Sequence, residues 1–196
     1  LKKHVDLMLP RQREFLAVLS RQLAAPGRLL VVPSRTVAED FVRMHDISLE
    51  QIRVVYNGVD PERFAPARSA EQRAAVRRSL GLGDQTVLAL IVAHNFRLKG
   101  VPALLRAMRR LAAEGLPLHL AVVGGKYVGR WRRAAARMGL AEQVSFVGSV
   151  DQTAPYYAAA DVDVHPTYYD PCSLVLLEGA ASGLPLLLTF LGTKER

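Results

Sequence analysis

The sequence is poor in four features that mark particular protein classes. A single cysteine, Cys172, excludes an internal disulfide and fits a reducing cytoplasm. No apolar run reaches the roughly 18 residues that a membrane-spanning helix needs, and no signal-peptide pattern opens the chain. One cysteine and five scattered histidines give no metal-ligand spacing. We therefore expect a cytoplasmic protein that holds no metal.

Acidic residues are scarce in the middle third of the chain. Residues 67–140 hold fourteen Lys/Arg and three Asp/Glu, a net charge of +11, whereas residues 1–66 carry +2 and residues 141–196 carry −5. This excess indicates an anionic partner, which could be nucleic acid, membrane phosphates or a phosphorylated small molecule. The alternative, which we favour for most of the arginines, is that they lie on solvated helix faces.

Short apolar strands alternate with helices in the second part of the chain. This pattern predicts a parallel sheet covered on both faces, a doubly wound α/β domain. The expected strands are 86–92, 118–123, 144–147, 162–165 and 185–189. The expected helices between them are 102–113, 130–138, 153–160 and 174–182.

The first part of the chain has fewer expected strands and helices and ends in a polar stretch. We expect helices over 11–23 and 36–45 and strands over 29–32 and 52–56, with capping boxes at Thr36/Glu39 and Ser48/Gln51. The polar, proline-containing stretch "PERFAPARSAEQR" then suggests a linker, followed by a helix over 70–80. We therefore divide the chain into residues 1–64 and residues 65–196.

Ligands of doubly wound sheets bind beyond the carboxyl ends of the strands. The loops there read "AHNFRLKG", "GGKYVGR", "GSVDQ" and "HPTYYDPCS". "GGKYVG" matches neither the dinucleotide fingerprint nor the Walker A motif. Gly124 either permits close approach of the backbone to a ligand or belongs to a plain turn. Arg97 and Lys99 precede a helix N-terminus, which is a favourable place for a phosphate group.

The stretch "DPCSLVLLEGAASG" contains an isolated carboxylate. Ser173 is a suitable N-cap for the helix that follows, which looks buried on nearly every side, and Glu178 lies on its second turn. A carboxylate among apolar residues is costly unless it has partners. Either Glu178 occupies the one solvated stripe of this helix, or it accepts hydrogen bonds from the hydroxyls of a ligand.

Together these motifs resemble the retaining, nucleotide-sugar-dependent glycosyltransferases of the large GT-B family, which includes bacterial lipopolysaccharide and capsule enzymes. "VVPSRTVAEDFVRMHDISLEQIRVVYNGVDPERFAP" is similar to the end of the family's N-terminal domain and its hinge. "FRLKG" is similar to its basic donor-phosphate motif, and residues 144–187 are similar to its E-x7-E region. The short spacing of Arg97 and Lys99 looks closest to that of lipopolysaccharide core glucosyltransferases.

The resemblance implies roles at the donor's diphosphate and sugar. Arg97 and Lys99 would neutralise the diphosphate, helped by the backbone amides of Ser173 and Leu174. Asp170 stands where the family's first glutamate contacts the donor sugar, and it is one methylene shorter.

The resemblance also implies roles at the nucleoside. Glu178 would bind the ribose hydroxyls, Val150 would lie near the base, and Gly124 would line the nucleotide. Cys172-Ser173 replaces the common Phe-Gly of the family, which affects the backbone near the sugar.

The function implied is transfer of a sugar from a nucleotide diphosphate sugar, with UDP-hexose expected, to a lipopolysaccharide, polysaccharide or lipid-linked acceptor. The configuration would be retained, no metal or cofactor would be needed, and the chain would associate peripherally with the inner face of the membrane. Two alternatives remain open: a sugar-nucleotide epimerase of the same architecture, and a basic nucleic-acid-binding module. The basic segment holds only Phe96, Tyr127 and Trp131 as aromatics, which disfavours specific nucleic-acid binding.

The resemblance covers only part of such an enzyme. The chain begins at Leu1 rather than Met and stops seven residues after the last expected strand, so we expect it to be a fragment. The acceptor-binding loop of the first domain and the final helix of the second would then lie outside it. We expect the chain by itself to be inactive.

Overall fold

The computed structural model describes residues 10–23, 25, 27–45, 47–66 and 70–189. The chain forms two compact units, Leu1–Asn57 and Gly58–Arg196. Phe64 belongs to the second unit, since its ring meets that of Tyr157 edge to face at 5.8 Å. The boundary that the sequence suggested after residue 64 therefore lies inside the second unit.

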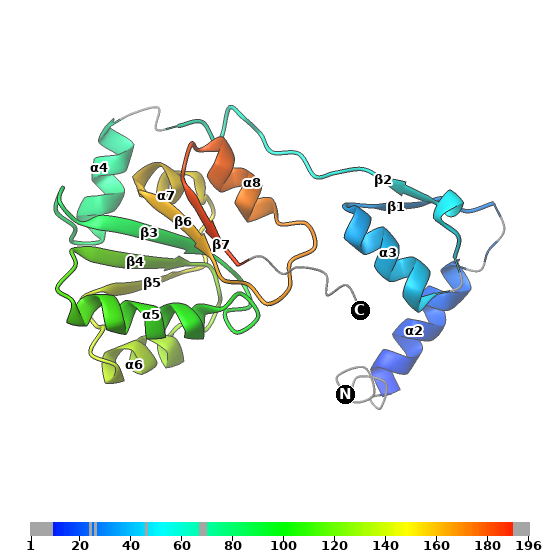
Figure 1. Ribbon diagram of the computed structural model, residues 1–196, viewed down its shortest axis with the longest axis horizontal. Coiled ribbons are helices and arrows are strands. Elements are labelled where there is room, and N and C mark those ends of the chain that lie inside the picture. Colours follow the sequence, from blue (N-terminus) through cyan, green and yellow to red (C-terminus); the bar gives the residue numbers. More distant parts are fainter. Residues whose placement is uncertain (1–9, 24, 26, 46, 67–69, 190–196) are drawn as a thin grey trace. The chain divides into compact units, whose positions relative to one another are not determined.

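The first unit is built on a parallel β-α-β arrangement (Figure 1). Its elements are α2 (Pro10–Leu23), β1 (Leu30–Val32), α3 (Arg35–Met44), the 3-10 turn η1 (Leu49–Gln51) and β2 (Ile52–Val54). The two strands pair in parallel with Leu30 opposite Ile52. The first unit has a small apolar core. Val32 of β1, Ala38 of α3, Ile52 of β2 and Ile47, which lies between α3 and η1, are buried at its centre.

The start of α3 differs from the capping box predicted at Thr36 and Glu39. Ser34 is the N-cap, and its hydroxyl accepts a hydrogen bond from the Val37 amide at 3.2 Å. The helix therefore begins earlier than predicted, because the serine that follows Pro33 has the extended backbone that an N-cap requires. The second capping box is confirmed: the Gln51 side chain accepts from the Ser48 amide at 3.1 Å.

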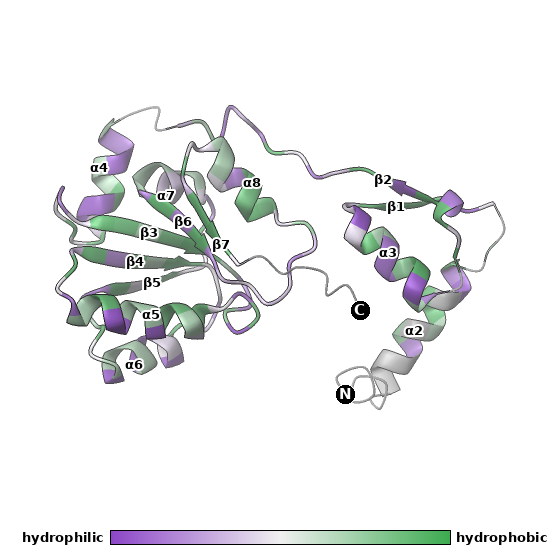
Figure 2. Ribbon diagram, in the orientation of Figure 1, coloured by the Kyte–Doolittle hydropathy of each residue, from purple (hydrophilic) through white to green (hydrophobic). Residues whose placement is uncertain are grey.

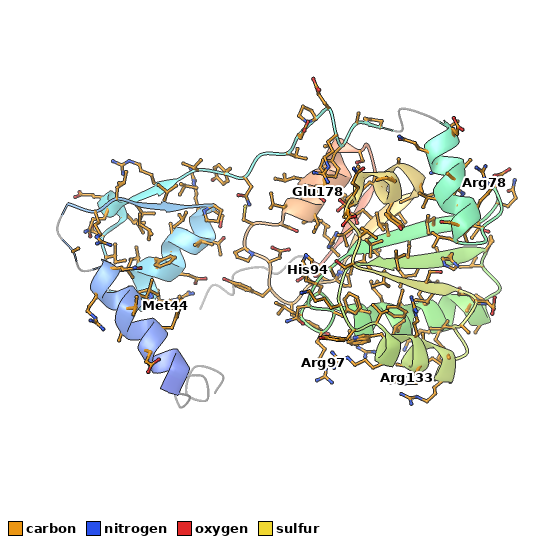
Figure 3. All side chains as sticks on the ribbon, turned by 180° about the vertical axis from the view of Figure 1, so that it is seen from behind. Met44, Arg78, His94, Arg97, Arg133 and Glu178 are labelled. Carbon is orange, nitrogen blue, oxygen red and sulfur yellow. The ribbon has the colours of Figure 1, made fainter. Side chains whose placement is uncertain are left out.

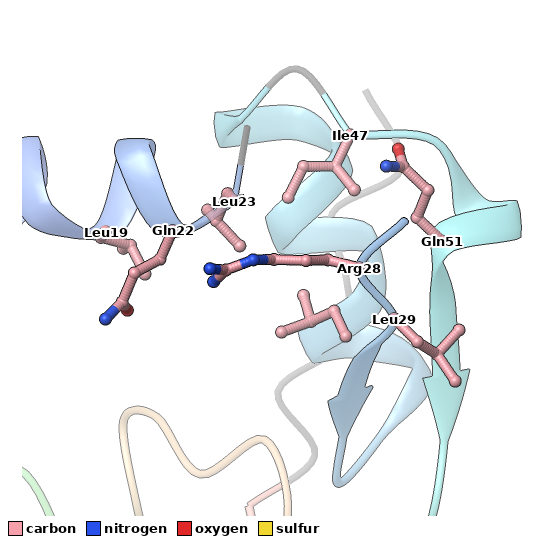
Figure 4. A pocket seen from close by; sticks show the side chains of 8 residues that line it. Leu19, Gln22, Leu23, Arg28, Leu29, Ile47 and Gln51 are labelled. Atoms are coloured by element: carbon pink, nitrogen blue, oxygen red, sulfur yellow. The ribbon is translucent and has the colours of Figure 1, made fainter. Parts of the chain in front are cut away.

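A cavity of about 180 Å³ lies within the first unit (Figure 4). Most of its lining is aliphatic, and the polar members are long side chains. It is lined by Leu19, Gln22, Leu23, Arg28, Leu29, Leu30, Ile47 and Gln51. None of the site residues predicted from the sequence lies in it.

The second unit has the alternating pattern that the sequence predicts. Its strands are β3 (Val87–Val92), β4 (Leu118–Val123), β5 (Val144–Gly148), β6 (Val162–His165) and β7 (Leu186–Leu188). Its helices are α4 (Ala70–Ser79), α5 (Val101–Ala113), α6 (Gly129–Arg137), α7 (Ala154–Ala159) and α8 (Leu174–Ala181).

The five strands form one parallel sheet in the order β5-β4-β3-β6-β7. The chain builds outward from β3 to β5, then crosses to the other side of β3 and continues with β6 and β7 (Figure 1). This reversal makes the carboxyl ends of β3 and β6 the topological switch point, where ligands of such sheets bind.

Helices cover both faces of this sheet. Apolar residues of α5 and α6 pack on one face in a cluster centred on Ile91, Leu120 and Val122. Residues of α4, α7 and α8 pack on the other face around Leu90 and Tyr157. The central strand β3 is apolar along its whole length (Figure 2), as expected for a strand buried on both sides.

An ion-pair network fixes α4 beside the sheet. The Asp161 carboxylate lies 2.5 Å from Arg73 and 3.2 Å from Arg77, and it accepts a 2.7 Å hydrogen bond from the Leu88 amide. Burial acts to raise the pKa of Asp161, but the Leu88 amide and the two guanidinium groups outweigh it and hold that pKa below its ordinary value.

Two features are absent from the described residues. Within residues 10–66 and 70–189, apart from the gaps stated above, no helix is long and apolar enough to cross a membrane. The same part of the chain contains no cluster of three or more His, Cys, Asp or Glu side chains arranged to hold a metal ion.

Candidate functional site

The loops after β3 and β6 are joined at the switch point. The Leu98 carbonyl accepts hydrogen bonds from the Tyr168 amide at 2.9 Å and from the Thr167 hydroxyl at 3.3 Å. Gly100 has a φ of 77°, and a Cβ there would collide with the carbonyl oxygen of Pro166. Glycine is required at this position because the two loops pass so close together.

Lys99 and Asp170, both predicted from the sequence as site residues, meet in this junction. The Lys99 ammonium lies 2.5 Å from the Asp170 carboxylate, and the two side chains are 19% and 12% exposed. The chain brings them together across 71 positions because one follows β3 and the other follows β6. A cation and a carboxylate thus stand side by side, near the surface but largely shielded from water.

Arg97, the other predicted cation, is placed differently. Its side chain is exposed and extends away from the ribbon (Figure 3), and it makes no ion pair with any described residue. Beside it, the loops after β3 and β4 enclose a pocket of about 370 Å³ with aromatic and basic walls. Its lining is His94, Asn95, Phe96, Gly125, Lys126, Tyr127, Arg130 and Trp131.

The start of α8 faces the same edge of the sheet. Ser173 is its N-cap, as predicted, but the serine side chain makes no capping hydrogen bond, and its buried hydroxyl has no partner among the described residues. The expectation that α8 is buried on nearly every side is wrong. Leu174 is 49% exposed, and Gly179 is the one fully buried residue of the helix, because α8 covers the sheet with one face only.

Glu178 lies half-buried on the second turn of α8 (Figure 3). Burial raises the pKa of its carboxyl group, and the negative charge of Asp163 acts in the same direction. The hydroxyls of Tyr157 and Thr153 and the charge of Arg63 oppose this shift without cancelling it. Glu178 is therefore a partly shielded acceptor held among polar groups, which is consistent with a ligand-facing carboxylate rather than a fully solvated one.

Sequence reasoning missed the polar groups around Glu178. Thr153 caps α7 and Tyr157 lies four positions later, so both project from the same side of that helix. The Tyr157 hydroxyl donates to the Val175 carbonyl at 3.1 Å, which ties α7 to the first turn of α8. The spacing of Thr153 and Tyr157 was visible in the sequence, but their meeting with α8 depends on tertiary packing.

A second buried pair, Asp163 and His165, lies under α8. The Asp163 carboxylate and the His165 ring are 3.1 Å apart, but the contact lacks hydrogen-bonding geometry. The side-chain oxygens of Asp163 and ring nitrogens of His165 make no hydrogen bond to a described residue. Gly179 leaves the space that the carboxylate occupies, because a Cβ on Gly179 would collide with Asp163 Oδ2. This pair fixes where the second turn of α8 crosses the sheet.

The remaining predicted residues, Gly124 and Val150, follow β4 and β5. Gly124 has a φ of 103°, its amide donates to the Gly148 carbonyl at 2.7 Å, and a Cβ would collide with the Ala93 carbonyl. Packing of neighbouring backbone therefore accounts for this glycine without a ligand. Val150 is half-buried against the apolar cluster around Tyr157.

Two family comparisons cover almost the whole chain. Residues 85–196 match the family described as glycosyl transferases group 1. Residues 2–63 match the family described as glycosyltransferase family 4. The two matches correspond to the two units of the structure.

Individual relatives and solved structures agree with this result. D-inositol 3-phosphate glycosyltransferase 2 of Catenulispora acidiphila is 35% identical over 83% of this chain and 40% of its own length. WaaG, a glycosyltransferase involved in lipopolysaccharide biosynthesis, superposes with a TM-score of 0.81 at 26% identity, over 95% of this chain and 51% of WaaG. Anabaena HepE in complex with UDP-glucose has a TM-score of 0.76 at 20% identity, over 88% and 48%.

The chain spans about half the length of these proteins. The match over residues 85–196 covers more than half of the chain, and the fold around the switch point is the one that these glycosyltransferases share. The chain therefore belongs to the group 1 glycosyltransferase family, with the GT-B fold.

Proposed function

We propose that this chain binds the nucleotide diphosphate sugar donor of a glycosyltransferase and presents its sugar for transfer. The observation that carries this proposal is the Lys99–Asp170 pair at the switch point, with Glu178 on the helix that follows. These three groups match in kind the three polar parts of such a donor: the ammonium suits its phosphates, and the two carboxylates suit the hydroxyls of its sugar and its ribose.

The adjacency of Lys99 and Asp170 supports this assignment chemically. In a nucleotide sugar the distal phosphate is bonded directly to the anomeric carbon, so groups that contact them must be neighbours. Lys99 would neutralise the phosphate while Asp170 accepts hydrogen bonds from the sugar. As the sugar departs, negative charge grows on the diphosphate, and Lys99 and Arg97 together with the free amides at the start of α8 stabilise it there.

Glu178 supplies the contact to the ribose in this proposal. A carboxylate accepts from two neighbouring hydroxyls at once, and its partial burial strengthens those hydrogen bonds. Val150, after β5, would lie near the base, and the backbone of Gly124, after β4, would line the nucleotide.

Relatives support a UDP-hexose as donor and a glycan or glycolipid as acceptor. HepE is described with UDP-glucose, WaaG is described in lipopolysaccharide biosynthesis, and several sequence relatives are named D-inositol 3-phosphate glycosyltransferases. We propose that transfer retains the sugar's configuration, as the resemblance of the motifs implies. We also propose that it needs no metal, since Lys99, Arg97 and the amides at the start of α8 would neutralise the diphosphate. We also propose that the protein associates peripherally with a membrane, where such acceptors are found.

The transfer proposal is tested by donor binding and by product analysis. We expect saturable binding of UDP-glucose to the chain in calorimetry, unchanged by EDTA. A protein that also includes the remainder of the GT-B enzyme should transfer radiolabelled glucose to a lipopolysaccharide or inositol phosphate acceptor, with the product's anomeric configuration read by NMR. Conversion of one free UDP-sugar into its epimer without an acceptor would instead identify a sugar-nucleotide epimerase, an alternative that the glycosyltransferase relatives do not favour.

A further inference from the structure

Two neighbouring helices of the second unit carry arginine without any carboxylate. There are three arginines in α5 and four in α6, and neither helix contains Asp or Glu. By contrast, α3 and α4 combine their arginines with acidic residues on the same helix. A solvated helix of ordinary composition mixes both signs, so α5 and α6 are unusual within the described part of the chain.

The arginines lie on one stripe of each helix. Arg106, Arg109 and Arg110 follow the i, i+3, i+4 spacing of a single helix face. On α6, a second stripe has i, i+3, i+7 spacing and consists of Arg130, Arg133 and Arg137. All six side chains are exposed, and Figure 3 shows Arg133 pointing outward from α6.

The opposite stripes of both helices are buried in one apolar cluster. Leu105 and Met108 of α5 and Ala135 of α6 pack there against the same face of the sheet. The six arginines therefore project outward from one helical layer. We call this surface, made of Arg106, Arg109, Arg110, Arg130, Arg133 and Arg137, the arginine face.

No ion pair within the described residues neutralises the arginine face. The basic partners of the ion pairs among the described residues are Arg43, Arg73, Arg77, Lys99 and His165, and none of them belongs to the arginine face. Arg132 is not counted in the face, because its guanidinium donates to the Phe146 carbonyl at 2.6 Å. The exposed acidic residues nearest in sequence, Glu114 and Glu142, lie in the turns after α5 and before β5.

We propose that the arginine face binds the phosphate headgroups of an anionic lipid surface. Arginine's planar fork suits phosphate oxygens, and a cluster of this size is typical of proteins that adsorb to anionic leaflets. The inference rests on the membrane association proposed above and locates it on the nucleotide-binding unit, away from Lys99, Asp170 and Glu178. The face has no apolar side chain to insert, so adsorption is electrostatic, reversible and sensitive to salt.

The structure favours lipid over nucleic acid as the partner. Binding of single strands uses aromatic rings on which bases stack. Trp131 is the one aromatic residue of the two helices, and it packs inward, with its ring 5.6 Å from that of Phe96. Tyr127, just before α6, is exposed, but one ring beside six arginines is not a row of rings on which successive bases stack, so the arginines match a layer of headgroups better.

Co-sedimentation of the full chain with vesicles tests the proposal. Vesicles of phosphatidylcholine alone are compared with vesicles containing increasing phosphatidylglycerol, at about 0.05 M and about 0.2 M NaCl. We expect binding only to the anionic vesicles, and weaker binding at the higher salt. Each arginine near the surface contributes about 1 kcal/mol, so replacing one stripe with glutamine should lower partitioning on the order of 100-fold.

The variants are chosen to separate the arginine face from general charge. One test variant replaces the stripe of α5 (Arg106→Gln, Arg109→Gln, Arg110→Gln) and the other replaces the stripe of α6 (Arg130→Gln, Arg133→Gln, Arg137→Gln). The control removes the same charge at exposed positions elsewhere, through Arg35→Gln, Arg53→Gln and Arg78→Gln. Lysine at the six face positions keeps the charge and should retain vesicle binding, even if a glutamine variant folds poorly.

Three outcomes would overturn the proposal. The first is a loss of vesicle binding in the control variant equal to that in the test variants. The second is binding to neutral vesicles as strong as binding to anionic vesicles. The third is binding of the chain to duplex DNA at about 0.15 M NaCl without binding to anionic vesicles. Calorimetry with UDP on the α5 variant keeps this result separate from the proposed function, because none of its three arginines lines the pocket beside Arg97, whereas Arg130 of the α6 stripe does. Unchanged UDP affinity with lost vesicle binding is the expected combination.

Discussion

The ammonium of Lys99 lies 2.5 Å from the carboxylate of Asp170, although 71 positions separate the two residues. Each side chain follows one of the two strands that flank the switch point of the sheet. The pair is largely shielded from water, so a bound phosphate can share the ammonium with the carboxylate at little cost in solvent reorganisation. In the proposed site the ammonium would contact the phosphate, and the carboxylate would accept hydrogen bonds from the sugar bonded to it.

Replacing Lys99 with alanine should weaken binding of UDP far more than binding of uridine, because in the proposed site the ammonium would face the diphosphate. The loss for UDP should be about 1.5–3 kcal/mol, the range for a hydrogen bond to a charged group. Calorimetry with both ligands measures the difference. Arg97→Ala should act in the same direction, whereas Arg78→Ala, at an exposed position on α4, serves as the control. Equal losses for UDP and uridine would contradict the assignment.

Replacing Glu178 with alanine should remove most nucleoside binding while leaving the fold intact. Two charge-assisted hydrogen bonds to the ribose are lost, at a cost on the order of 2–4 kcal/mol. Comparing uridine with 2′,3′-dideoxyuridine isolates this contribution: the wild type should discriminate strongly between them and Glu178→Ala should not. Circular dichroism checks the fold. Undiminished affinity of the variant for uridine would show that Glu178 does not face the nucleoside.

Uridine affinity should fall as the pH is lowered toward the pKa of Glu178. Burial raises that pKa above its ordinary value, so the loss should begin at a higher pH than an exposed glutamate would give. The ionised carboxylate accepts from the ribose hydroxyls, and protonation removes that capacity. Uridine is the right probe because UDP carries a phosphate that titrates near pH 6. Glu178→Gln should bind more weakly, with a flat profile over the same range.

Replacing Gly100 with alanine should destabilise the second unit and weaken UDP binding together. The added Cβ collides with the Pro166 carbonyl and forces apart the loops that hold Lys99 and Asp170. Gly115 is a matched control, since its φ of 73° is equally left-handed but no atom lies within 4 Å of its missing Cβ. Gly115→Ala should cost about 1–2 kcal/mol, and Gly100→Ala about 1–3 kcal/mol more. Chemical denaturation that gives equal losses for the two would show that the loops are not tightly joined.

Removing the carboxylate of Asp161 should be among the more destabilising single changes in the second unit. Asp161→Ala leaves the guanidinium of Arg77, 6% exposed, without its charged partner, at a cost of about 3–5 kcal/mol. Asp151→Ala, at an exposed site, should stay within about 0.5 kcal/mol of the wild type. Urea denaturation measures both.

The pH dependence of stability follows from the lowered pKa of Asp161. A carboxyl group that is more acidic when folded stabilises the protein above its unfolded pKa. That stabilisation disappears as the pH falls through the folded value. The wild type should therefore lose more stability on acidification than Asp161→Ala does, and parallel curves for the two proteins would contradict this role.

The regular elements were predictable because local sequence determines them. The strands Leu118–Val123 and Val162–His165 have the predicted bounds, although His119, Asp163 and His165 interrupt their apolar runs, because turn signals flank both strands. Boundaries at helix starts were less certain: Ser34 rather than Thr36 caps α3, because both residues are acceptable N-caps and tertiary packing selected one.

The site was predictable only as a set of loops. Lys99, Asp170 and Glu178 could be named because they follow strands, but their distances depend on strand order, which periodicity does not determine. The ion pair of Lys99 with Asp170 and the polar groups of Thr153 and Tyr157 near Glu178 are tertiary features. The partial exposure of α8 was missed for the same reason, because an apolar sequence does not determine how many other elements pack against a helix.

The most direct test of the central claim is hydrogen–deuterium exchange of the full chain with and without UDP. We expect protection in peptides that cover residues 95–100 and 168–178, where the loops after β3 and β6 and the start of α8 converge. Glu178→Ala should abolish that protection at the same UDP concentration. Protection confined to other segments, such as α5 and α6, or none at all at saturating UDP, would contradict the claim that the switch point binds the nucleotide.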